Sequence, residues 1–158
     1  MTASAAPVAG FRNAAALRAL VGAEPLFSEW LTVDQARVDR FAEATGDHQW
    51  IHVDPERARR ESPFGGPVAH GFLTLALIPA LLGKTLALEQ RMGVNYGLNR
   101  VRFTSPVPVG SQLRGKFVVE SVVDIDNAGV QVEWTVTLEK QGSDRPVCVA
   151  EFITRHYF

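Results

Sequence analysis

The apolar segment that follows Gly71 constrains the fold more than any other part of this chain. Its sequence, FLTLALIPALLGKTLA, is apolar nearly all the way around a helix. A surface helix has one apolar stripe and one polar face, so a helix of this kind must be enclosed by other structure. The sequence therefore predicts a helix that begins near Gly71, is kinked by Pro79 and is wrapped by a curved sheet.

The second half of the chain has the pattern of such a sheet. From about residue 94 onward, β-branched and aromatic residues alternate with polar ones, and the turn sequences SPVPVG, DNAG and GSDRP separate the runs. Helices followed by strands predict one α+β domain with an antiparallel sheet, over residues 11–158. The expected strands are Val94–Phe103, Gln112–Asp124, Val130–Gln141 and Val147–His156, with an earlier strand at about Leu26–Leu31.

Capping signals predict two helices in the first half of the chain. Thr32 and Gln35 form a capping-box pattern that is typical of a helix start, and Gly46 is well placed to end that helix. Asp54 and Pro55 then resemble the N-cap and first residue of a brief second helix.

Charge and composition exclude several classes of function. The chain has 16 basic and 17 acidic side chains, a net charge of -1, and no block of like charge, which argues against a nucleic-acid partner. Its single cysteine, Cys148, lies in an apolar run, which predicts a buried strand residue and a reducing compartment. The longest apolar stretch is too short to span a bilayer. We expect a cytoplasmic protein with no membrane association, whose residues 1–10 form a flexible N-terminus.

The polar cluster between Thr45 and His52 is the first candidate for chemistry. Asp47 and His52 are five residues apart and would differ by about 140° in direction on a continuous helix, so they cannot converge unless the chain turns. Gly46 and Pro55, on either side, favour such a turn. A carboxylate and an imidazole that share one water suit general acid–base catalysis near neutral pH. A purely structural turn, with Asp47 capping backbone N–H groups, is the alternative.

A second candidate is Ala69-His70-Gly71, directly before the apolar helix. A helix start presents unpaired N–H groups and the positive end of the dipole, and a glycine lets a ligand approach the backbone closely. Gly71 is therefore a candidate for stabilising the oxyanion of a thioester carbonyl. The alternative is that Gly71 only relieves crowding where the helix begins.

Metal and cofactor sites are weakly indicated. His48 and His52 are four residues apart, but binding one metal would require a continuous helix, which Gly46 disfavours. The glutamate of a zinc-protease motif is missing, and so are a phosphate-binding glycine loop and a dinucleotide fingerprint. We expect neither a metal nor a cofactor.

These residues resemble the signature of the MaoC-like, (R)-specific enoyl-CoA hydratases. That signature has a Gly-Asp pair, a histidine shortly after it, and a short helix that contains alanine. Gly46-Asp47, His52 and Ala58 match it, whereas Gln49-Trp50 stand where the family often has Asn-Pro. The likeness extends over about residues 25–155 and is greatest to the single-hot-dog branch that includes nodulation protein N-like proteins. Its further segments are Phe64-Gly65, Val68–Phe72, Asn95–Phe103 and Pro106–Gly110.

The resemblance implies a hot-dog fold, in which an antiparallel sheet wraps a long helix, and a homodimer. It also implies reversible hydration of trans-2-enoyl thioesters, carried by coenzyme A or acyl-carrier protein, to (R)-3-hydroxyacyl thioesters without a cofactor. Asp47 and His52 would hold the water, and the Gly71 N–H would stabilise the enolate-like oxygen. Asn95 is a candidate for a supporting group, with a structural hydrogen bond as the alternative.

Two other functions are compatible with the same fold. The first is an acyl-CoA thioesterase, although many of these enzymes place a carboxylate on the central helix and this chain has none between Phe72 and Leu88. The second is a non-catalytic acyl-thioester-binding module, against which the retention of both Asp47 and His52 argues.

Overall fold

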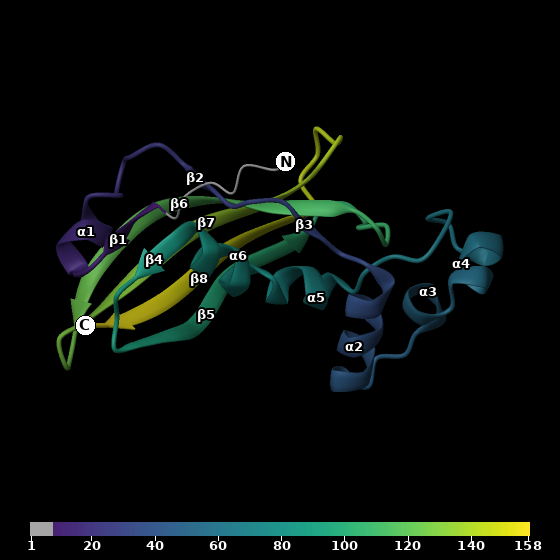
Figure 1. The fold of residues 1–158 in the computed structure, drawn as a ribbon, viewed down its shortest axis with the longest axis horizontal. Coiled ribbons are helices and arrows are strands. Elements are labelled where there is room, and N and C mark those ends of the chain that lie inside the picture. The colour runs from purple at the N-terminus through teal and green to yellow at the C-terminus, as the bar shows by residue number, and fades with distance from the viewer. Residues whose placement is uncertain (1–7) are drawn as a thin grey trace.

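A six-stranded antiparallel sheet curves around a pair of short helices (Figure 1). The structure is a computed structural model that describes residues 8–158. The strands follow the order β2-β6-β7-β8-β5, and β3 pairs with β6 beside β2. Their bounds are β2 Leu26–Phe27, β3 Leu31–Thr32, β5 Met92–Phe103, β6 Gln112–Ile125, β7 Gly129–Lys140 and β8 Cys148–Tyr157.

The predicted apolar helix is present and lies on the concave side of the sheet (Figure 1). It is divided into α5 (Gly71–Ala76) and α6 (Ile78–Thr85), with Leu77 between them. The interruption lies two residues before Pro79, the residue at which the sequence predicts a kink and whose missing N–H cannot continue the helical hydrogen bonds. The helix ends two residues earlier than its sequence predicts, since Leu86 is extended and begins strand β4.

The core forms between α6 and the inner face of the sheet. Ile78 and Leu81 on the helix are each 1% exposed. On β7, buried residues alternate with half-buried ones, as the sequence predicts. The buried side chains of this strand are Val130, Val132, Trp134, Val136 and Leu138. The predicted α+β hot-dog architecture is therefore confirmed.

The strand predictions are accurate to within about two residues for the four long strands. The short early strand is the exception, because it is interrupted between β2 and β3. At Ser28 the chain leaves the regular pattern, and the side-chain oxygen of Ser28 accepts a hydrogen bond of 2.8 Å from the N–H of Gly115 on β6. Cys148 is fully buried as predicted, and burial raises the pKa of its thiol to about 11.

Three helices gather beyond one end of the sheet (Figure 1): α2 (Gln35–Thr45), α3 (Trp50–Val53) and α4 (Pro55–Glu61). The predicted Asp54 cap of α4 is confirmed. The capping box at Thr32 is wrong, because Thr32 pairs with β6 and Asp34 caps α2 by accepting from the N–H of Arg37. Gly46 ends α2 in the left-handed conformation, as predicted.

The N-terminal part holds two elements that the sequence did not predict. Strand β1 (Val8–Phe11) pairs in parallel with β4 (Leu86–Leu88), and helix α1 (Ala14–Arg18) follows it. Of the flexible segment expected at residues 1–10, the first seven residues lie outside the described part and the last three belong to β1. Within residues 8–158, no helix is both long enough and apolar enough to cross a membrane.

Candidate active site

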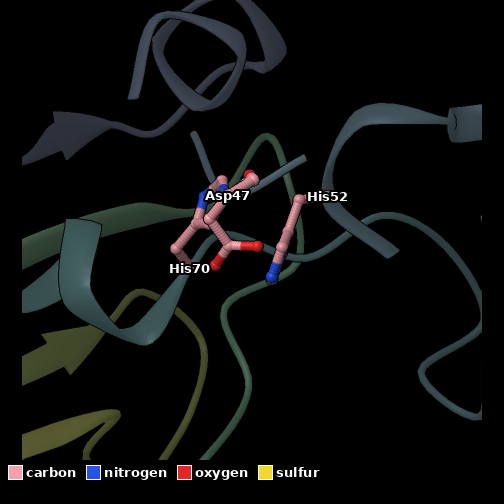
Figure 2. A group of neighbouring side chains, drawn as sticks. All are labelled: Asp47, His52 and His70. Atoms are coloured by element: carbon pink, nitrogen blue, oxygen red, sulfur yellow. The ribbon is translucent and has the colours of Figure 1, made fainter. Parts of the chain in front are cut away.

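Three side chains from different segments meet where α2, α3 and α5 come together (Figure 2). Asp47 directly follows the left-handed Gly46, His52 lies in α3, and His70 directly precedes α5. One carboxylate oxygen of Asp47 and one ring nitrogen from each histidine all lie within 4.8 Å of one another. The turn at Gly46 thus brings Asp47 and His52 together, as the sequence required for a shared site.

His52 is buried and its protonation pattern is set by its backbone contact. Its Nδ1 lies 2.6 Å from the carbonyl oxygen of Val68. A carbonyl only accepts, so Nδ1 carries the hydrogen and Nε2 of the neutral ring is left with a free lone pair. Burial lowers the pKa of His52, the bond to Val68 opposes this, and His70 and Asp47 have smaller effects that lower and raise it. The ring is therefore suited to accept a proton at Nε2.

Asp47 is exposed and belongs to a short connection between α2 and α3. Its side chain accepts a long hydrogen bond of 3.4 Å from the N–H of Gln49. Its backbone carbonyl accepts a shorter bond of 2.9 Å from Nε2 of His70. The carboxylate thus remains available to a small molecule placed between it and His52.

An apolar cavity of about 360 Å³ opens beside these residues. His52, Gly71, Thr74 and Phe103 are among the residues that line it, and the Phe103 ring packs against Gly71. A Cβ atom at position 71 would lie 2.9 Å from the Phe103 ring, so only glycine fits there without a shift. Asp47 is not among the lining residues and reaches the cavity only through its proximity to His52.

Two other candidates lie apart from this cluster. Asn95 is on β5 and lines two cavities farther along the apolar helix, beside Pro79 and Phe152. His48 is exposed, and its nearest charged partner is Glu43 at 3.8 Å. The structure therefore places neither residue with Asp47 and His52.

The sequence did not predict a role for the side chain of His70. It is 2% exposed, and its ring stacks on that of His52 with the centroids 3.8 Å apart. His70 belongs to the segment Ala69-His70-Gly71, in which the sequence points to Gly71 alone as a candidate. The signal available was a histidine at the start of an apolar helix, where a polar ring must find a buried partner.

Comparison with known proteins gives the family. Residues 16–141 match the family described as MaoC like domain. The chain belongs to the MaoC-like family. The resemblance inferred from the motifs around Asp47 and His52 is confirmed.

Relatives of this MaoC-like chain cover most of its length. It is 48% identical over 147 residues to 3-hydroxyacyl-thioester dehydratase Z from Mycobacterium tuberculosis (strain H37Rv), which spans 92% of the chain and 97% of that protein. It is 51% identical over 136 residues to nodulation protein N from Rhizobium leguminosarum bv. viciae, which spans 85% and 84%. The unliganded R-hydratase PhaJ1 from Pseudomonas aeruginosa has a TM-score of 0.67 at 23% identity, over 85% of this chain and 78% of that one, and shares the fold.

Proposed function

We propose that this protein catalyses the reversible hydration of trans-2-enoyl thioesters to (R)-3-hydroxyacyl thioesters. The observation that carries the proposal is the meeting of Asp47 and His52 beside an apolar cavity. The dehydratase relatives support the same chemistry. Two hydrogen bonds of about 2.8 Å to one water can span about 5 Å, so a single water fits between the two groups.

In the hydration direction, this water supplies both the oxygen and the hydrogen that are added. Nε2 of His52 accepts a proton from the water while the water oxygen forms a bond to C3. The electron pair of the double bond moves toward the thioester carbonyl, and C2 then receives a proton from the same pair of residues. Asp47 orients the water and offsets the charge on the imidazolium ring. Dehydration follows the same steps in reverse.

The thioester carbonyl gains negative charge during this reaction and needs a hydrogen-bond donor. Gly71 lines the cavity beside His52, and its N–H is at the first position of α5, where the helix itself offers no acceptor. This N–H would stabilise the enolate-like oxygen. The proposal covers thioesters of either coenzyme A or acyl-carrier protein.

A homodimer is part of the proposal. Strand β5 is at the edge of the sheet and pairs only with β8 among the described strands. An unpaired apolar edge favours the addition of another strand, and a second copy of the chain offers the same edge. The exposed apolar side chains on this strand are Met92, Val94, Tyr96, Leu98 and Phe103.

A cytoplasmic location is supported by the single buried thiol.

A hydration assay tests the proposed function. Purified protein is mixed with crotonyl-CoA and longer trans-2-enoyl-CoA substrates, and loss of the enoyl absorbance is followed, with chiral analysis of the product. We expect loss of absorbance and an (R)-3-hydroxyacyl product. Release of free coenzyme A without hydration would instead identify a thioesterase, and acyl-CoA binding without turnover would identify a binding module.

A further inference from the structure

His70 is more deeply buried than either member of the proposed catalytic pair, and the mechanism above gives it no task. It is 2% exposed. Its Nδ1 is also buried and has no hydrogen-bond partner among the described residues. A buried histidine with only one of its two ring nitrogens bonded costs free energy, so the one contact that remains calls for an explanation. That contact is made to Asp47.

The bond between His70 and Asp47 fixes both a tautomer and a backbone position. Nε2 lies 2.9 Å from the Asp47 carbonyl oxygen, so Nε2 carries the hydrogen and donates it. The other hydrogen bonds of Asp47 join its N–H to the Thr45 hydroxyl and its carboxylate to the Gln49 N–H, both at 3.4 Å. The His70 bond is therefore the shortest hydrogen bond that holds Asp47, and it ties an exposed connection to the start of α5.

The ring of His70 also packs against the ring of His52. The two imidazoles stack with centroids 3.8 Å apart and planes 25° from parallel. On another element, Phe41 packs against His70 at a centroid distance of 5.0 Å. The same side chain thus contacts the backbone of one proposed catalytic residue and the ring of the other.

We propose that His70 is a positioning residue that aligns Asp47 and His52 on their shared water. It acts through these two residues and does not touch the reacting atoms. Displacements of about 1 Å in such a pair are enough to slow catalysis strongly, which is why a rigid support matters. The inference rests on the proposed hydratase function.

Two substitutions separate the two contacts of His70. His70→Phe keeps an aromatic ring beside His52 but removes the hydrogen-bond donor. His70→Gln keeps an amide donor near the position of Nε2 but removes the ring. The exposed neighbour His48 provides a matched control, His48→Gln. For each variant, kcat and KM for crotonyl-CoA are measured together with the thermal unfolding midpoint.

We expect His70→Phe to lower kcat by about tenfold or more with KM within about threefold, because the cavity is unchanged and only the alignment is lost. His70→Gln should recover part of that rate, and His48→Gln should match the wild type. A folded His70→Phe variant with a wild-type kcat would overturn the proposal. Equal losses in both variants that follow a large fall in the unfolding midpoint would also overturn it, because they indicate packing alone.

A double-mutant cycle distinguishes a positioning role of His70 from a purely structural one, because it measures whether the losses in rate are additive. If His70 acts through Asp47, His70→Phe should have little further effect on the residual rate of an Asp47→Asn variant. Additive losses would contradict the inference.

If His70→Phe does not fold, His70→Asn, whose amide is too short to reach the Asp47 carbonyl, replaces it with the same expectations. A wild type that hydrates no enoyl-CoA refutes the proposed function itself, and the role of His70 falls with it.

Discussion

The Nδ1–H of His52 donates to the carbonyl oxygen of Val68 across 2.6 Å. This bond joins α3 to the segment that leads into α5, and it leaves Nε2 as the only ring nitrogen that can accept a proton. The base proposed here is therefore defined by a backbone contact rather than by a charged partner. Its consequences can be tested by changing either the ring or the carboxylate.

Replacement of either proposed catalytic residue should remove most of the activity. General acid–base catalysis contributes about 10²- to 10⁴-fold, so Asp47→Asn and His52→Gln should each lower kcat for enoyl-CoA hydration by at least about a hundredfold. Circular dichroism spectra should match the wild type, because Asp47 is exposed and glutamine keeps a polar side chain of similar length at position 52. Activity within about threefold of wild type in either variant would contradict the assigned roles.

Gly71→Ala should lower kcat/KM for hydration by at least about tenfold. The added Cβ would lie 2.9 Å from the Phe103 ring and would narrow the cavity beside the Gly71 N–H. The double variant Gly71→Ala/Phe103→Leu distinguishes the two explanations for this glycine, with Phe103→Leu alone as control. Continued low activity supports a role in binding the thioester oxygen. Recovery to the level of Phe103→Leu would mean that Gly71 serves packing only.

The stability of the protein should decrease in acid because of His156. Burial lowers the pKa of this residue to about 4. In the unfolded chain its pKa is near 6.5, so the unfolded state takes up the proton first as the pH falls. The contribution of the neutral His156 ring to the free energy of unfolding is fully present above about pH 6.5 and is lost as the pH falls toward 4. The full loss is on the order of 3 kcal/mol. Urea unfolding at pH 7 and pH 4.5 should show this decrease.

A non-titrating variant is the control for this effect. His156→Gln keeps a polar side chain beside Gln90 and Thr154, which both bond to the native ring. Its stability should change less between the two pH values than that of the wild type. An equal change in both proteins would assign the acid sensitivity to other groups.

A charge placed on the edge strand should disrupt the proposed dimer. Leu98 on β5 is 42% exposed, and Leu98→Lys would place an ammonium group within the predicted interface. Val123→Lys, at a residue 48% exposed on β6, is the matched control. Sedimentation velocity should report a dimer for the wild type and the control and a monomer for Leu98→Lys. A wild type that is monomeric at micromolar concentration would refute the dimer.

The sequence predicts the large elements of this fold because their signals are local. The apolar helix after Gly71 and the alternating strands can each be recognised within a dozen residues. The cap of α2 cannot be assigned from the local sequence alone. Thr32 fits a capping box as well as Asp34 fits an N-cap, and only the pairing of Thr32 with β6 decides between them. The parallel pairing of β1 with β4 joins segments far apart in sequence, and neither segment has an alternating pattern of its own.

The candidate site, like the fold, was predictable only where its signals are local. Gly46 indicated the turn that lets Asp47 and His52 meet, and the structure brings them together. His70 was not predictable, because its contact with Asp47 links residues 23 positions apart and goes to a carbonyl that every residue possesses. A bond to a backbone carbonyl does not depend on which residue occupies position 47, so it cannot be predicted from the residue type there.

The bond from His70 to a backbone carbonyl has a practical consequence. Because His70 holds the main chain at position 47 and not the carboxylate, the support should survive when Asp47 is replaced by asparagine. Such a variant would keep the shape of the pocket while removing an acid–base group. It is therefore the form of the protein best suited to trapping an intact enoyl thioester for crystallography.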